Sequence, residues 1–278
     1  MTKVAALYIA TGKYTVFWPE FYESAEQYLL RDCEVHYFVF TDAATLPGEE
    51  NPRVHICPQE AYSWPFATLR RFEIFLKQEQ ALRGFDYIFF FNANAQFMQP
   101  VTREMLLPRA EKGERLLVVQ HPSFYAKPNY EFTYDRNPRS TACIPYGLGK
   151  YYVCGGVNGG TAPAFLELCR TLDKRIRRDL QHNVIALWHD ESQINRYIVA
   201  SPVANLTGSV ENYEAFMEAL LVETQREPTV EQLARYLDIP ALRKDAPETQ
   251  LSPAVQRWNH FAMRAARWSQ NHLFKKGK

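Results

Sequence analysis

Residues 86–97 constrain the fold more than any other stretch of the sequence. They contain an unbroken aromatic and β-branched run, residues 87–91, that is too short for a typical helix and reads as a strand buried on both faces. Asn92-Ala93-Asn94 follows at once, and short polar residues of this kind suit a strand end or a turn. Ligands of open α/β sheets lie beyond the carboxyl ends of the strands, so we expect polar groups to meet a substrate here.

Asn92 and Asn94 stand where many sugar-nucleotide transferases carry Asp-x-Asp, whose carboxylates hold a divalent cation against a diphosphate. An amide offers no charge to a hard cation, although it still donates and accepts hydrogen bonds. A nucleotide-sugar site at this position is therefore expected to work without a metal or other cofactor. The alternative is a buried strand followed by an Asn-rich turn.

Composition narrows the functional classes. The chain has 278 residues, of which 46% are hydrophobic, and its net charge of +1 gives no global field that would attract nucleic acid. Its five cysteines form no CxxC pair, which argues against a disulfide framework and a structural zinc site. We find no signal peptide and no apolar run of membrane-spanning length, so a cytoplasmic protein is expected.

Strand and helix patterns alternate along the first 205 residues, which predicts an α/β fold. We expect strands at residues 4–10, 35–40, 53–57, 86–91, 116–120 and 151–160. We expect helices at residues 18–30, 66–82, 163–182 and 188–198, with a further helix or turn at 103–107.

Two parts of the sequence lack this alternation. Residues 123–149 mix aromatic, proline and basic residues without a period, which in a compact domain is typical of a functional loop. Beyond residue 205, amphipathic patterns predict helices at 211–223, 230–237 and 253–272. We therefore divide the chain into a catalytic domain, residues 1–205, and a helical C-terminal region, residues 206–278, packed on it.

The most informative motif is Trp188-His189-Asp190-Glu191-Ser192. Adjacent carboxylates at a helix start serve as an N-terminal cap in many proteins. Together with Trp and His they are costly to bury without a task, and such carboxylates serve glycosyl chemistry as base, nucleophile or ion-pair stabiliser.

The other candidate site residues each have both a functional and a purely structural interpretation. In Arg70-Arg71 one arginine could face a diphosphate, or the pair could be an exposed basic surface. His121 and the aromatic residues of the following loop suit a sugar, or simply close a core. His121 and His189 are potential metal ligands, but spacing places no third ligand beside them.

Taken in order, several motifs are shared with one family of enzymes. They are Tyr14, Tyr37-Phe38-Val39-Phe40-Thr41-Asp42, Arg70-Arg71-Phe72-Glu73, Asn92-Ala93-Asn94, His121-Pro122, Phe132-Thr133-Tyr134-Asp135-Arg136, Ile144-Pro145, Tyr151-Tyr152, Gly155-Gly156, Gly159-Gly160 and Trp188-His189-Asp190-Glu191-Ser192. From about residue 4 to residue 197 the chain resembles glycosyltransferase family 6, which contains the histo-blood-group A and B transferases and α-1,3-galactosyltransferase. Its Asn-x-Asn resembles the bacterial branch, where animal members have Asp-x-Asp.

The resemblance implies a GT-A fold with a mixed central sheet flanked by helices, whose nucleotide-binding half is Rossmann-like. It implies retaining transfer of GalNAc or Gal from UDP, in α-1,3 linkage, to a galactoside such as fucosylated lactose. Glu191 would lie beneath the anomeric carbon and Asp190 would bind donor-sugar hydroxyls. Other donor-binding positions are Ile9, Thr11, Tyr14, Arg71, Asn92, Asn94, Cys154, Gly155, Gly156 and His189. The acceptor positions are His121, Thr133 and Trp188.

A glycine at position 156 leaves room for an acetamido group, so we favour UDP-GalNAc over UDP-Gal. The chain departs from the family after Tyr197, where we find neither the expected Pro- and Tyr-containing segment nor the basic tail that folds over UDP. Two interpretations of the C-terminal end stay open. Basic residues near the end could close over the diphosphate, or the end could make a peripheral membrane contact through Trp258 and Trp268. A glycan-binding protein that has lost catalysis, and a metal-dependent transferase using His189 and Asp190, are the competing functions.

Overall fold

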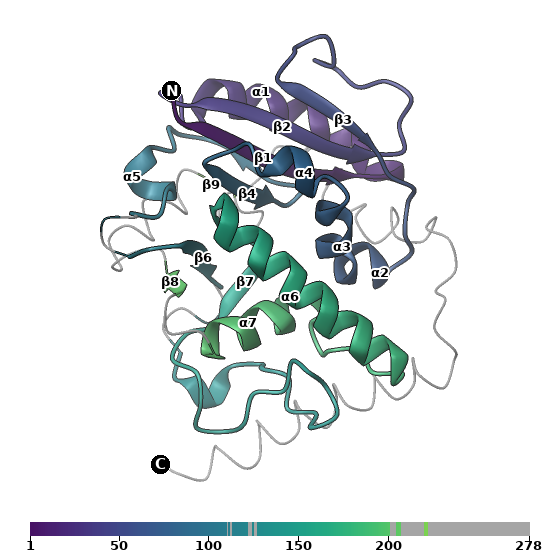
Figure 1. The fold of residues 1–278 in the computed structure, drawn as a ribbon, viewed down its shortest axis with the longest axis vertical. Coiled ribbons are helices and arrows are strands. Elements are labelled where there is room, and N and C mark those ends of the chain that lie inside the picture. The colour runs from purple at the N-terminus through teal and green to yellow at the C-terminus, as the bar shows by residue number, and fades with distance from the viewer. Residues whose placement is uncertain are drawn as a thin grey trace.

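The computed structural model describes residues 1–109, 111, 113–121, 124, 127–200, 204–206 and 220–221 (Figure 1). The strands are β1 (Lys3–Ala10), β2 (Glu34–Thr41), β3 (Val54–Pro58), β4 (Tyr87–Phe91), β5 (Gln96–Phe97), β6 (Leu116–Gln120), β7 (Val153–Thr161), β8 (Ala204–Leu206) and β9 (Leu220–Leu221). The helices are α1 (Trp18–Tyr28), α2 (Phe66–Leu69), α3 (Arg71–Leu76), α4 (Glu79–Leu82), α5 (Arg103–Leu106), α6 (Ala162–Gln181) and α7 (His189–Ala200). The predicted alternation of strand and helix is confirmed.

Among the described residues the central sheet has seven strands in the order β3-β2-β1-β4-β7-β6-β8. Strands β3, β2, β1 and β4 run parallel, whereas β7 is antiparallel to both β4 and β6. The sheet is therefore mixed, as predicted. Because β7 runs against β4, pairing Phe91 with Val157, the first residues of β7 lie at the edge where β4 ends.

The sheet separates two hydrophobic cores, which explains the unbroken apolar run in β4. Phe89 and Phe91 join the core beneath α1 and β5, while Ile88 and Phe90 join the core beneath α3, α6 and α7. Successive side chains of a strand point to opposite faces, so a strand covered on both sides needs apolar residues throughout. Figure 1 shows α6 lying across one face with α7 beside it.

The single helix predicted for residues 66–82 is wrong. The segment forms three short helices, α2, α3 and α4, and the backbone leaves the helical region at Arg70 (φ −92°, ψ 10°) and again at Gln78 (φ −107°, ψ 16°). Neither break is marked by Gly or Pro, so periodicity could not locate it. The break at Arg70 restarts the chain with Arg71 as the first residue of a new helix, where its side chain is buried.

The loop prediction for residues 123–149 agrees with the described residues 127–149, which are irregular apart from one 3₁₀ turn, Asn129–Glu131. The C-terminal helices predicted at 230–237 and 253–272 lie outside the described residues. In the helix predicted at 211–223, Leu220–Leu221 instead form strand β9, paired with β5. Strand β8 pairs with β6, and the division of the chain at residue 205 stays a prediction. None of the helices in the described ranges combines the length and apolar character needed to cross a membrane.

Candidate active site

Arg71 and Asp190 form a buried ion pair at the centre of the candidate site, with side chains 6% and 5% exposed. Arg71 Nη2 donates to Asp190 Oδ2, and Nη1 donates to the carbonyl of Gly155 over 2.7 Å. The guanidinium also lies 4.5 Å from the centre of the Phe90 ring. Burial lowers the pKa of Arg71 to about 10, against an opposing effect of Glu191, so the group stays cationic at neutral pH. One arginine thereby ties α3 to β7 and α7.

Glu191 follows Asp190 on α7, and both oxygens of its carboxylate accept hydrogen bonds. Oε1 accepts from the Tyr152 hydroxyl over 2.8 Å, and Oε2 accepts from the backbone N–H of Gly155 over 2.9 Å. Asn195, one turn further along α7, binds both backbone groups of Val153 at 2.8 and 2.9 Å. The first turns of α7 are thus fastened along the start of β7, which fixes where the Glu191 carboxylate points.

The start of α7 has an unusual backbone. His189 adopts a φ of +52°, a region that few residues other than glycine occupy. The Ser192 hydroxyl accepts from the Trp188 N–H at 2.9 Å, and the His189 ring packs edge-on against Trp64 with 5.0 Å between centres. The two carboxylates that follow bind groups on other elements, which argues against a role limited to capping their own helix.

The two asparagines after β4 lie at the carboxyl end of the strand. The Asn92 side chain is exposed and Asn94 is half-buried. The turn between them is held by the Tyr8 hydroxyl, which donates to the Ala93 carbonyl over 2.7 Å. The Asn92 N–H donates to the Gly156 carbonyl over 2.9 Å, so this turn borders the same segment of β7 that holds Glu191.

Gly155 and Gly156 have different surroundings. A Cβ at Gly155 would lie 2.7 Å from Asp190 Oδ2 and 3.0 Å from Arg71 Nη2, so the ion pair leaves no room for a side chain. A Cβ at Gly156 would lie 3.8 Å from the nearest atoms of Asn92, an ordinary contact. Cys154, just before them, is half-buried, and burial raises the pKa of its thiol to about 11. Position 156 therefore accepts a side chain where position 155 does not.

The donor-binding residues predicted on the first strand lie at the same edge of the sheet. Ile9 is near the carboxyl end of β1, which pairs in parallel with β4, so Thr11 and Asn92 both follow neighbouring strands. The Tyr14 N–H donates to the Thr11 carbonyl over 3.2 Å, which turns the chain just after β1. None of the hydrogen bonds of Arg71, Asp190 and Glu191 described above involves these residues.

The three predicted acceptor residues converge on one side chain, Tyr152. The His121 ring lies 5.8 Å from the Tyr152 ring, and Thr133 lies close enough to the Tyr152 hydroxyl to lower the pKa of that phenol. Trp188 packs against the aromatic cluster to which Tyr152 belongs, and its buried Nε1 has no hydrogen-bond partner within the described ranges. The other buried members of the cluster are Phe132, Tyr134 and Ile144.

Neither Tyr152 nor Asn195 is among the site residues predicted from the sequence. Asn195 had a usable signal, because it lies four residues after Glu191 and so on the same face of the helix. Tyr152 lies in the shared Tyr151-Tyr152 motif, but an aromatic residue in an aromatic-rich segment reads equally well as core.

The described ranges contain no group of three or more His, Cys, Asp or Glu side chains arranged to hold a metal ion. The hypothesis of a metal held by His189 and Asp190 meets a specific obstacle, because the Asp190 carboxylate already accepts from the Arg71 guanidinium. A cation at that carboxylate would have to compete with a buried cationic partner.

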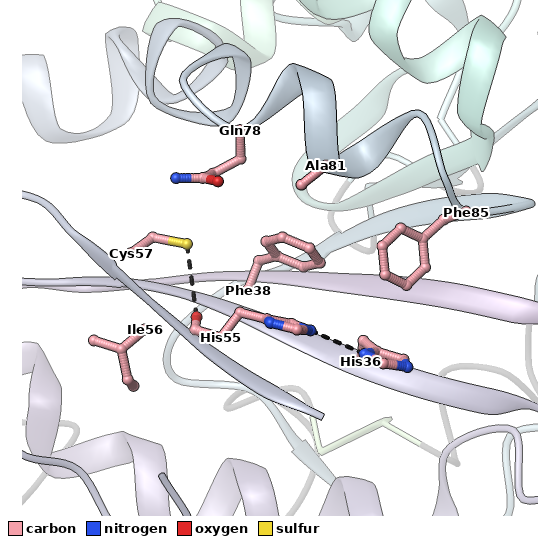
Figure 2. A pocket seen from close by; sticks show the side chains of 8 residues that line it. All are labelled: His36, Phe38, His55, Ile56, Cys57, Gln78, Ala81 and Phe85. Carbon is pink, nitrogen blue, oxygen red and sulfur yellow. Dashed lines mark hydrogen bonds between the residues drawn. The ribbon is translucent and has the colours of Figure 1, made fainter. Parts of the chain in front are cut away.

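A hollow of about 500 Å³ lies against β2, β3 and α4 and contains none of the predicted site residues (Figure 2). His36 and His55 point toward one another across the two strands, with 2.9 Å between Nδ1 and Nε2, and His36 Nε2 lies 2.8 Å from Glu34 Oε1. Burial and the neighbouring His36 lower the pKa of His55.

Sequence similarity to known proteins extends over most of the described residues. The model of glycosyltransferase family 6 matches residues 2–208. Globoside alpha-1,3-N-acetylgalactosaminyltransferase 1 of Homo sapiens is 33% identical over 199 residues, covering 69% of this chain and 55% of that protein. O-antigen biosynthesis glycosyltransferase WbnI of Escherichia coli is 32% identical over 190 residues, covering 68% of this chain and 79% of that protein. Histo-blood group ABO system transferase 2 of Rattus norvegicus is 28% identical over 205 residues, covering 71% and 57%.

The helix-flanked mixed sheet is GT-A-like, and the family model and these relatives identify the chain as a member of a glycosyltransferase family. The match spans about half the length of the animal relatives. Within that class, the chain belongs to glycosyltransferase family 6.

Proposed function

We propose that this glycosyltransferase moves GalNAc, or less readily Gal, from UDP to a terminal galactoside in α-1,3 linkage, with retention of anomeric configuration and without a metal ion. The observation that carries the proposal is the Glu191 carboxylate, held by Tyr152 and by the Gly155 backbone beside the Arg71–Asp190 pair. A carboxylate fixed from two sides is suited to act on a sugar carbon. The relative's name, globoside alpha-1,3-N-acetylgalactosaminyltransferase, supports the linkage and the sugar.

In the proposed reaction the bond between the anomeric carbon and the β-phosphate oxygen breaks, and its electron pair leaves with UDP. Glu191 either bonds to the anomeric carbon from the β face or stabilises the oxocarbenium-like cation there. The acceptor oxygen then bonds to the same carbon from the face that UDP left, displacing the Glu191 carboxylate where that has bonded to the carbon, and the acceptor proton passes to the departing diphosphate. Asp190, held by Arg71, would bind the donor-sugar hydroxyls.

Metal independence rests on side-chain chemistry. Asn92 and Asn94 lie at the strand end where an Asp-x-Asp motif would hold a cation, and amides are weak ligands for hard cations. Amides can instead hydrogen bond to ribose or phosphate oxygens. The charge that a metal would supply must then come from basic side chains.

The preference for GalNAc rests on Gly156. Its open side borders Asn92, and a hydrogen atom in place of a side chain leaves space for an acetamido group there. Discrimination by one small group is worth only about 1–3 kcal/mol, so we expect a preference and not exclusion of UDP-Gal.

The test is UDP release from UDP-GalNAc and UDP-Gal, with 2′-fucosyllactose as acceptor, in excess EDTA and again with manganese. Turnover in EDTA supports a metal-independent transferase, and the ratio of the two donors tests the role of Gly156. Turnover only with manganese contradicts the metal-independent mechanism. Binding of glycan or nucleotide without turnover in either condition favours the glycan-binding alternative.

The cytoplasmic location stays a prediction, with which the five free cysteines agree.

A further inference from the structure

Tyr152 lies between the predicted acceptor residues and Glu191. It is 2% exposed and directly precedes β7. Its hydroxyl donates to Glu191 Oε1 over 2.8 Å, and Thr133 lies beside the same phenol. The His121 N–H donates to the Tyr152 carbonyl over 2.8 Å, and the two rings are also in contact. A continuous chain of contacts thus runs from predicted acceptor residues to the predicted nucleophile.

We propose that Tyr152 is a positioning residue that holds the Glu191 carboxylate in its reactive orientation and connects it with the acceptor side of the site. This inference rests on the proposed function, because it assigns Tyr152 a task in that reaction. Glu191 has a second donor, the Gly155 N–H, which fixes only Oε2. Without the phenol, Oε1 loses its hydrogen bond and the carboxylate can rotate about the remaining one.

Burial alone does not account for this arrangement. A buried phenol needs only one hydrogen-bond partner, and a backbone carbonyl is sufficient, as the Tyr151 carbonyl is for Tyr134. Burial and the adjacent carboxylate both raise the pKa of Tyr152 well above its ordinary value, so the phenol keeps its proton and acts as a donor. Glu191 therefore receives a permanent neutral donor on the side that faces the acceptor residues.

Tyr134 provides a matched control within the same cluster. It is fully buried, its ring stacks 5.4 Å from that of Tyr152, and its hydroxyl donates to the backbone carbonyl of Tyr151 and not to Glu191. Tyr134→Phe and Tyr152→Phe each remove one buried hydroxyl from one aromatic core. Only the second change removes a contact with Glu191.

The experiment measures kcat and KM for the donor with UDP-GalNAc and 2′-fucosyllactose, in the wild type and in Y152F, Y134F, E191Q and the Y152F/E191Q double variant. We expect Y152F to lower kcat on the order of 10- to 100-fold with little change in donor KM, because misplacing a reacting group acts on the chemical step. Y134F should stay within about threefold of wild type, and Y152F should cost no further activity in the E191Q background, since residues that act as a unit are not additive.

Two results would overturn the proposal: equal losses in Y152F and Y134F, which would indicate core packing alone, or an undiminished Y152F penalty in the E191Q background. Circular dichroism and thermal unfolding establish that each variant folds. If Y152F does not fold, 3-fluorotyrosine at position 152 keeps the ring while changing the donor strength. It should alter kcat where the same replacement at 134 does not, and an unaltered kcat counts against the proposal. An inactive wild type would contradict the proposed function itself, whereas an active wild type with an unaffected Y152F contradicts only this inference.

Discussion

The adjacent glycines of β7 give a pair of substitutions that each add one methyl group, at positions one residue apart. In Gly155→Ala the new Cβ would lie 2.7 Å from Asp190 Oδ2 and 3.0 Å from Arg71 Nη2, so the buried ion pair must move. In Gly156→Ala the new Cβ would lie at an ordinary 3.8 Å from Asn92. Neither glycine has a positive φ, so the backbone accepts alanine at both positions.

We expect the two substitutions to change the free energy of unfolding in opposite directions. Replacing glycine by alanine where the backbone allows it stabilises by about 0.4–1 kcal/mol through the unfolded state, which is the effect expected for Gly156→Ala. At Gly155 the same gain is opposed by an overpacking cost of about 1–3 kcal/mol. Since about 1 kcal/mol shifts Tm by roughly 2–4 °C in a domain of this size, G155A should melt several degrees below wild type and G156A at or slightly above it.

Activity should separate the two variants further. Displacing Asp190 and the neighbouring Glu191 by a fraction of an ångström should lower kcat of G155A on the order of 100-fold. G156A should keep substantial turnover while its preference for UDP-GalNAc over UDP-Gal falls by about 10-fold or more. The assays are differential scanning calorimetry and UDP release with each donor. A G155A enzyme with wild-type Tm and kcat would refute the packing argument, and a G156A enzyme with an unchanged donor ratio would refute the assignment of the acetamido pocket.

Three further changes test other parts of the structure. Arg71→Met leaves the Asp190 carboxylate buried without its cation and should cost about 3–5 kcal/mol of unfolding free energy, measured by urea denaturation; a loss below 1 kcal/mol would contradict the buried pair. Asn195→Leu removes both hydrogen bonds to the Val153 backbone and should destabilise by about 1–3 kcal/mol and lower kcat, whereas unaltered kinetics would show that α7 is positioned without it. Folding lowers the pKa of His55, so below the unfolded value of about 6.5 the unfolded chain binds protons that the folded protein does not, and stability should fall as the pH drops through that range. His55→Phe should flatten this dependence between pH 8 and pH 5.5, and an unchanged slope would exclude His55 as its source.

The sequence predicted the elements whose patterns are local. Phe89 and Ile88 are neighbours on β4 but belong to different hydrophobic cores. Their strand was recognisable in the sequence because a strand that is buried on both faces of a sheet is apolar throughout. The helix breaks at Arg70 and Gln78 were not recognisable, because neither is marked by Gly or Pro.

The candidate site shows the same division. Motifs identified Arg71, Asp190 and Glu191, but not that the first two would be ion-paired across 119 positions of sequence. The hydrogen bond of Tyr152 to Glu191 joins residues 39 positions apart and depends on how α7 lies against β7. Contacts between residues so far apart in the sequence depend on tertiary structure, and the hydrophobic periodicity of the sequence does not predict them.

The antiparallel direction of β7 has a consequence for how this enzyme can diversify. Because the strand enters the sheet at the edge where β4 ends, consecutive residues from Tyr152 to Gly156 contact Glu191, the Arg71–Asp190 pair and Asn92 in turn, which are the proposed nucleophile, ion pair and border of the donor pocket. Removing or inserting one residue here would exchange the position that meets Asp190 with the one that meets Asn92. Related chains should therefore align without gaps through this segment and change donor by substitution at Cys154 and Gly156. Differences in length belong in the irregular loop before it, where the chain can lengthen without shifting the strand.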